Sequence, residues 1–132
     1  MNPIIHQSMT HVLLSDDRVI FAYLYGSSIA AQEYNDIDIA VYAKPDCNPF
    51  LLSADIKIAL SEVTDTAPDV FDLRIINHLL ETGDIFALLY LKEVLENGNL
   101  LIDKDNDLRT DFIEAYGMKY RECEGLIAEV LA

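Results

Sequence analysis

Positive charge is scarce in this sequence. Its 132 residues contain nine Lys and Arg against 23 Asp and Glu, which gives a formal net charge of −14 at pH 7. The basic residues are scattered, and none lies between Arg18 and Lys44. Proteins that bind nucleic-acid phosphates without regard to sequence need clustered Lys and Arg, so we expect no direct nucleic-acid binding. For the same reason we expect no binding to anionic membrane surfaces. The acidic balance is compatible with a basic protein partner or with a site that recruits cations.

Cysteine and long apolar runs are scarce as well. Cys47 and Cys123 form neither a CxxC pair nor any metal-ligand spacing, and two isolated cysteines suit a reducing cytosol. No stretch approaches about 18 consecutive apolar residues, so no membrane span is expected. The N-terminus lacks the basic segment and the cleavage site of a signal peptide. We therefore expect a cytoplasmic protein that does not contact membranes.

Apolar residues, in contrast, are abundant. They make up 52% of the chain, which is enough to build a core and argues against disorder. The length predicts one domain, residues 1–132. The sequence contains no repeats and no low-complexity tracts.

Hydrophobic periodicity predicts a mixture of helices and strands. Helices are expected at residues 3–14, 50–63, 80–96 and 108–131. Strands are expected at residues 19–25, 36–42, 69–76 and 100–102. The last helix carries an apolar stripe: Phe112, Tyr116, Tyr120, Cys123, Ile127 and Val130. That stripe packs on the chain's own core or forms a subunit interface, which would suit its tyrosines.

Residues 19–42 organise the rest of the chain. The first strand ends at Gly26 and Ser27, which offer backbone N–H groups and a hydroxyl for a phosphate, although they would equally suit a turn and a helix cap. On the next strand, Asp36 and Asp38 share one face and lie roughly 7 Å apart. Two carboxylates at that spacing can hold hard cations between them. Because Asp is disfavoured in strands, the pair indicates more than a solvated face.

A third carboxylate is expected from the strand at 69–76. Asp72 lies on the mixed face of this strand together with Arg74. Asp69 lies at the strand entrance on the apolar face, where a solvated turn role is more natural. We therefore choose Asp72 as the candidate. Its alternative is an ordinary surface position or an ion pair with Arg74.

Gly26-Ser27, a spacer, the pair Asp36-x-Asp38 and a later Asp72 together resemble the signature of the nucleotidyltransferase superfamily that includes DNA polymerase β. The likeness is closest to the minimal nucleotidyltransferases (MNT) and covers most of the chain. It implies an α+β (α/β) fold, a small mixed β-sheet flanked by helices, with a long C-terminal helix. It also implies that Asp36, Asp38 and Asp72 are catalytic and hold two Mg²⁺ ions, while Gly26 and Ser27 bind the phosphates of ATP.

Members of this minimal family are typically encoded beside HEPN-domain toxins, which are ribonucleases. The resemblance implies an antitoxin of a type VII-like HEPN/MNT pair, which transfers AMP from ATP to tyrosine hydroxyls of the toxin. The alternative is a catalytically weak antitoxin that neutralises its toxin by complex formation. A third hypothesis is a nucleotidyltransferase acting on a small-molecule hydroxyl, but the chain has little room for the extra substrate domain of such enzymes.

The spacer departs from the family pattern in two ways. The eight residues between Ser27 and Asp36 are fewer than is usual, and none of residues 28–35 is Arg or Lys. Relatives often carry an Arg just after the Gly-Ser pair, where it helps to hold a triphosphate. Lys44 and Lys57 are the candidates to supply that charge from elsewhere in the fold.

Overall fold

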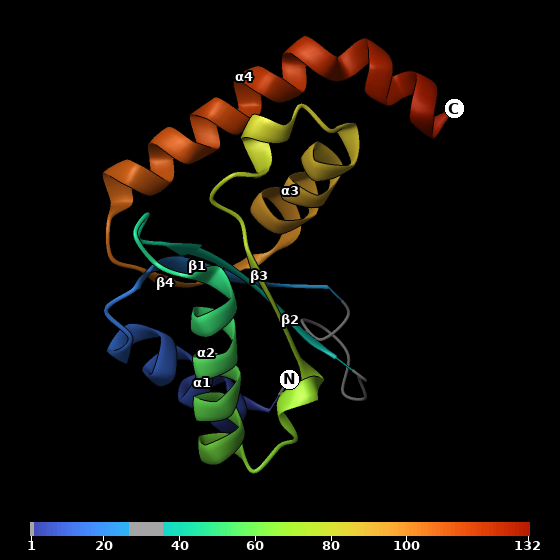
Figure 1. The fold of residues 1–132 in the computed structure, drawn as a ribbon. Coiled ribbons are helices and arrows are strands. Elements are labelled where there is room, and N and C mark those ends of the chain that lie inside the picture. Colours follow the sequence, from blue (N-terminus) through green and yellow to red (C-terminus); the bar gives the residue numbers. More distant parts are fainter. Residues whose placement is uncertain (1, 27–35) are drawn as a thin grey trace.

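The computed structural model describes residues 2–26 and 36–132. Its helices and strands follow one another in the order α1 (Pro3–Ser15), β1 (Val19–Tyr25), β2 (Ile37–Ala43), α2 (Pro49–Thr64), β3 (Phe71–Ile75), α3 (Ile85–Asn97), β4 (Asn99–Asp103) and α4 (Asn106–Leu131) (Figure 1). Two short 3-10 helices, η2 (Pro68–Val70) and η3 (Leu79–Thr82), precede β3 and α3.

The four strands form one mixed sheet in the order β3-β2-β1-β4. Strand β1 runs antiparallel to both β2 and β4, whereas β2 and β3 are parallel and are connected through α2. The predicted mixed sheet with flanking helices and a long C-terminal helix is therefore confirmed. Because β1 is antiparallel to its neighbour, the end of β1 lies at the same edge of the sheet as the starts of β2 and β3.

Helices cover both faces of the sheet. Figure 1 shows α1 and α2 on one side and α3 and α4 on the other. Alternate residues of each strand supply the two cores, as expected for a strand buried on both faces. On β2, for example, Ile37, Ile39 and Val41 join the α1–α2 core, while Ala40 joins the α3–α4 core. Asp38 shares the face of Ala40 and thus lies on the α3 side of the sheet.

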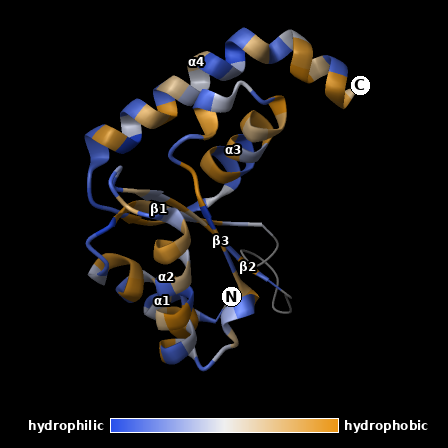
Figure 2. Ribbon diagram, viewed as in Figure 1, coloured by the Kyte–Doolittle hydropathy of each residue, from blue (hydrophilic) through white to orange (hydrophobic). Residues whose placement is uncertain are grey.

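The apolar stripe of α4 packs mainly on the chain's own core. Phe112, Tyr116 and Ile127 are buried, and Tyr120 and Cys123 pack beside them, whereas Val130 near the end of the helix is exposed. Hydrophobic and hydrophilic residues alternate along α4, as expected for a helix with one buried stripe (Figure 2). Of the two roles considered for the stripe, the structure supports packing on the core.

Two predicted element starts are wrong for local reasons. The third strand begins at Phe71 rather than at residue 69, because Pro68–Val70 forms a 3-10 helix. The third long helix begins at Ile85 rather than at residue 80. There the left-handed Gly83 ends η3, and the Asp84 side chain accepts a hydrogen bond from the Phe86 N–H to cap α3.

Cys47 and Cys123 are both free thiols, so the structure contains no disulfide between them. Within the described residues, no helix combines the length and the apolar character needed to cross a membrane.

Candidate active site

One edge of the sheet collects the residues of the candidate site. The last residue of β1, Tyr25, pairs with Asp38 near the start of β2. Asp38 in turn pairs with Asp72 near the start of β3. In parallel strands, directly paired residues project their side chains on the same face. Register alone therefore places Gly26, Asp38 and Asp72 together at this edge.

Asp38 and Asp72 are close enough to influence each other's ionisation. Partial burial raises the pKa of Asp38, and the negative charges of Asp72 and Asp36, together with a hydrogen bond to Asp72, raise it further. Asp72 is exposed. Two neighbouring carboxylates that repel each other and face solvent are suited to a divalent cation, whose charge offsets the repulsion. The donor set thus fits Mg²⁺.

Gly26 allows the backbone to turn directly against this pair. Its φ of +81° lies in the left-handed region that favours glycine. A Cβ atom at this position would collide with Oδ2 of Asp38. Glycine is therefore required twice, once by the backbone conformation and once by the carboxylate beside it.

The remaining predicted site residues lie at or beyond the margin of this cluster. Asp36 is exposed and precedes β2 by one residue, although its charge still acts on Asp38. Ser27 lies outside the described residues, as does the rest of segment 27–35. Within the described part of the chain, no group of three or more His, Cys, Asp or Glu side chains is placed to hold one metal ion. Because Mg²⁺ often binds through one or two carboxylates plus phosphates and water, a preformed cage is unnecessary.

The structure places the two acidic residues of the third predicted strand differently. Asp69 lies in η2, exposed and ahead of β3, whereas Asp72 lies opposite Asp38. Arg74 forms no ion pair with Asp72 in the described structure. Its guanidinium carbon lies 4.1 Å from the centre of the Tyr90 ring instead.

Tyr25 and Tyr90 line the site and were not predicted from the sequence. The Tyr90 hydroxyl donates a hydrogen bond to the Tyr25 hydroxyl over 2.8 Å. Burial raises the pKa of both tyrosines, so both hydroxyls stay protonated at neutral pH. A signal for Tyr25 existed, since it directly precedes Gly26. Tyr90 lies on α3, and only the tertiary packing brings it to β1.

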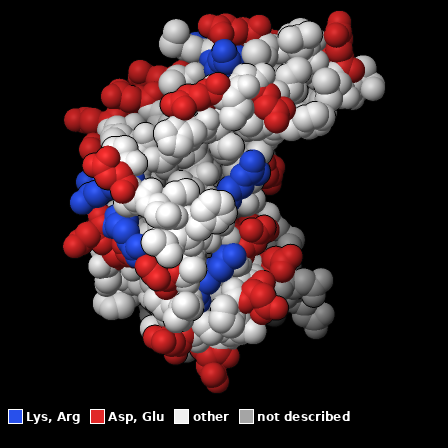
Figure 3. All heavy atoms as spheres, in the orientation of Figure 1, with Lys and Arg blue, Asp and Glu red and all other residues white. Residues whose placement is uncertain are grey.

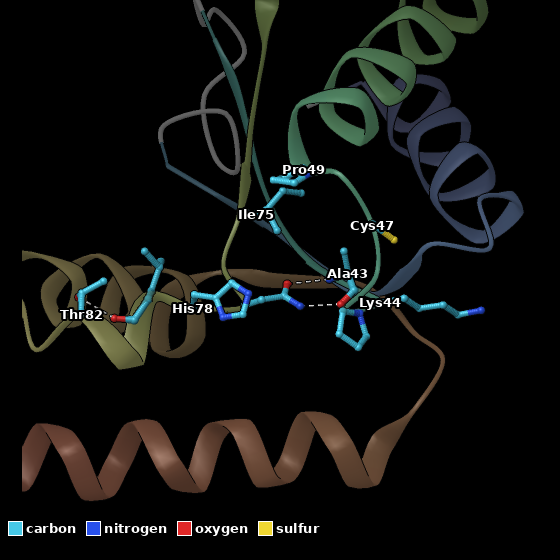
Figure 4. Close-up of a pocket in the computed structure, with 10 residues that line it drawn as sticks. Ala43, Lys44, Cys47, Pro49, Ile75, His78 and Thr82 are labelled. Carbon is cyan, nitrogen blue, oxygen red and sulfur yellow. Dashed lines mark hydrogen bonds between the residues drawn. The ribbon is translucent and has the colours of Figure 1, made fainter.

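A separate cavity of about 210 Å³ lies at the opposite end of β2 and β3 (Figure 4). Ala43, Ile75 and His78 are among its lining residues. The Asn77 side chain fixes one wall, because it accepts a hydrogen bond from the Ala43 N–H and donates one to the Ala43 carbonyl. Neither Asp38 nor Asp72 lines this cavity, so it is distinct from the acidic site.

A mixed four-stranded sheet that presents paired carboxylates beside a glycine turn has the architecture of a nucleotidyltransferase. The model of the polymerase β nucleotidyltransferase family matches residues 7–107. The chain belongs to this family.

Solved toxin–antitoxin complexes contain chains with the same fold. A chain from a mutant MntA–HpeT complex has 19% identity and a TM-score of 0.64, with 100% of both chains covered. A chain from the tri-AMPylated Shewanella oneidensis HEPN toxin in complex with MNT antitoxin has 22% identity and a TM-score of 0.61, again over 100% of both chains. A chain from a toxin–antitoxin complex with AMP-PNP has 22% identity and a TM-score of 0.63, over 96% of this chain and 98% of that one.

At these identities the likeness establishes the fold. No curated protein matches the chain.

Proposed function

We propose that this protein is an antitoxin that transfers AMP from ATP to a tyrosine hydroxyl of a HEPN-domain ribonuclease toxin. The observation that carries the proposal is the register of β2 and β3, which pairs Asp38 with Asp72 at the edge where Gly26 ends β1. Paired carboxylates next to a tight glycine turn suit a reaction that moves a charged phosphoryl group.

Each residue of the site has a definite task in this reaction. Asp36, Asp38 and Asp72 would hold Mg²⁺, which when bound neutralises charge on the phosphate oxygens. Asp72 would also accept the proton of the attacking tyrosine hydroxyl as the tyrosine oxygen bonds to the α-phosphorus and pyrophosphate leaves. The Gly26 backbone would approach the phosphates closely, and Ser27 would donate a hydrogen bond to them.

The proposed partner follows from charge and from the relatives. A ribonuclease must bind the phosphates of RNA and therefore presents a basic surface. This protein carries a net charge of −14, and acidic side chains spread along α4 and around the rim of the face in Figure 3. Among its structural relatives, one complex joins an AMPylated HEPN toxin to an MNT antitoxin, and another contains AMP-PNP.

Intact-mass spectrometry of the partner tests the proposal. The product of the neighbouring gene is incubated with this protein, ATP and Mg²⁺, and we expect it to gain one or more AMP units. The Asp38→Asn variant should transfer none, whereas Asp69→Asn, which removes the same charge from η2, should transfer normally. A partner whose mass is unchanged by the wild-type protein would rule out transfer.

A second candidate is an antitoxin that acts by binding alone. It is favoured by the absence of Arg and Lys from residues 28–35, because a triphosphate carries several negative charges. In that case the partner would form a tight complex without any change in mass, and Asp38→Asn would neutralise the toxin as well as the wild type does.

A further inference from the structure

Three residues form a chain of contacts on the α3 side of the acidic pair, Asp38 and Asp72. The guanidinium group of Arg74 on β3 lies over the ring of Tyr90 on α3. The Tyr90 hydroxyl in turn donates a hydrogen bond to the hydroxyl of Tyr25 on β1. The two tyrosine rings meet edge to face with their centroids 5.3 Å apart. The chain therefore links β3 and β1 across β2, the strand that carries Asp38.

Arg74 follows Asp72 by two residues on β3, so the two side chains lie on the same face of the strand. Residues two apart on a strand project their side chains in parallel, roughly 7 Å from one another. Arg74 pairs with Ala40 of β2, just as Asp72 pairs with Asp38. Because Ala40 has only a methyl group, it leaves the guanidinium group room to reach Tyr90 across β2.

No carboxylate among the described residues forms an ion pair with Arg74, although acidic residues dominate the chain and Asp72 is close by in sequence. Its side chain is exposed, so it can meet a ligand. Stacking on a half-buried tyrosine holds the guanidinium group by its face and leaves its N–H donors available at the edge.

The two lysines considered from the sequence lie elsewhere. Lys44 follows the end of β2, which is the opposite end from Asp38. Lys57 belongs to α2, on the other face of the sheet. Among the described basic residues, Arg74 is the one whose charge influences the pKa of both Tyr25 and Tyr90. It lowers both pKa values, whereas the charge of Asp72 raises them.

We propose that Arg74, held by Tyr90 and Tyr25, binds phosphate oxygens of a nucleoside triphosphate at the Asp38–Asp72 site. It supplies the positive charge that residues 28–35 lack. The inference rests on the proposed nucleotidyl transfer and adds a binding residue to it. Guanidinium groups suit this task because their N–H donors match the spacing of phosphate oxygens.

Calorimetric titration with ATP and Mg²⁺ tests the inference without requiring transfer. Arg74→Ala should weaken ATP binding by about 10-fold to 100-fold, which corresponds to the loss of charge-assisted hydrogen bonds. Arg74→Lys should restore part of the affinity, because it keeps the charge and loses the planar fork. Lys44→Ala removes an equal charge at the far end of β2 and should leave ATP affinity within about twofold.

Two further measurements make the result specific. Binding of adenosine should change little in Arg74→Ala, because adenosine carries no phosphate. Tyr90→Phe keeps the ring under the guanidinium group and removes only the hydrogen bond to Tyr25, so it should weaken ATP binding less than Arg74→Ala does. Should Arg74→Ala fold poorly, as judged by circular dichroism, Arg74→Gln keeps the length of the side chain and replaces it in the same titration.

The outcomes separate this inference from the proposed function. A folded Arg74→Ala or Arg74→Gln variant that binds ATP as the wild type does would overturn the role of Arg74 and leave AMP transfer standing. A wild-type protein that binds no ATP with Mg²⁺ would overturn both proposals. Wild-type binding that is lost only in the Arg74 variants supports the inference.

Discussion

At the level of single residues, Asp38 is subject to opposing demands. Binding a divalent cation requires carboxylates close together, whereas folding without the cation is opposed by their repulsion. The raised pKa of Asp38 reflects this conflict, because burial and the charges of Asp72 and Asp36 all disfavour its ionised form. The protein therefore retains at its candidate site a group that lowers stability in the absence of a ligand.

We predict that Asp38→Asn raises stability while it abolishes Mg²⁺-dependent transfer. Removing one of two facing like charges should stabilise the protein by a few tenths to about 1 kcal/mol near neutral pH without divalent cations. Thermal unfolding measures the gain. Asp69→Asn is the charge-matched control, and it should change stability little because Asp69 is exposed in η2. A destabilised Asp38→Asn variant would show that the carboxylate is structural.

The same gain should depend on pH. Because the pKa of Asp38 is higher in the folded than in the unfolded protein, the folded state binds the proton more tightly. The stabilisation from protonated Asp38 is fully present below its unfolded-state pKa of about 3.9. It is lost as the pH rises through the higher pKa of Asp38 in the folded protein. The advantage of Asp38→Asn should therefore vanish near pH 4 and grow towards neutrality. A pH-independent advantage would contradict the raised pKa.

Gly26 offers a second test at the residue level, because the chain contains a matched glycine. Gly26 and Gly83 both have positive φ angles, +81° and +67°. A Cβ at Gly83 would meet no atom within 4 Å, whereas one at Gly26 would strike Asp38. Both Ala variants should lose roughly 1–2 kcal/mol through backbone strain, and Gly26→Ala a further 1–3 kcal/mol through the clash. Denaturant unfolding compares them, and equal losses would mean that Asp38 yields without cost.

At the level of elements, α4 is joined to the sheet by aromatic contacts. The Phe112 ring lies 5.2 Å from that of Tyr42 and 6.0 Å from that of Phe21, measured between centroids. The Tyr116 hydroxyl donates a hydrogen bond to Glu96 of α3. These contacts hold α4 on the same face of the sheet as α3.

We predict a large difference between two substitutions on α4. Phe112 is 8% exposed, so Phe112→Ala should destabilise the protein by about 3–5 kcal/mol through the cavity that it creates. Met118 is 58% exposed on the same helix, and Met118→Ala should change stability by no more than about 0.5 kcal/mol. Denaturant unfolding of the isolated protein measures both. If Phe112→Ala were harmless in isolation, the stripe would serve an interface and not the core.

At the level of the whole molecule, the sequence was sufficient to predict the helices and strands and to place part of the candidate site. Alternating residues on β2 and β3 placed Asp38 and Asp72 on matching faces, because a strand fixes the direction of each side chain. Long apolar periodicity likewise predicted the four helices. The starts of β3 and α3 were missed because short 3-10 helices precede them. One begins at Pro68, and the other ends at the left-handed Gly83, after which Asp84 caps α3.

What the sequence could not supply was pairing between distant segments. The contacts of Arg74 with Tyr90 and of Tyr90 with Tyr25 join β3, α3 and β1, and no local pattern encodes which helix residue meets which strand. The same limit applies to the ion pair with Arg74 that we considered as an alternative role for Asp72. That pair is the obvious local choice, but the described structure places the guanidinium group over an aromatic ring.

The net charge of the whole molecule should influence how fast it associates with its partner. If the proposed HEPN partner presents a basic RNA-binding surface, a protein of net charge −14 should be drawn to it over long distances. The association rate constant should then fall by at least about tenfold between roughly 0.01 M and 0.15 M salt, because the screening length shrinks from about 30 Å to about 8 Å. The dissociation rate should change much less. Stopped-flow mixing measures both rates, and an association rate that does not respond to salt would show that the acidic surface has no part in recognising the partner.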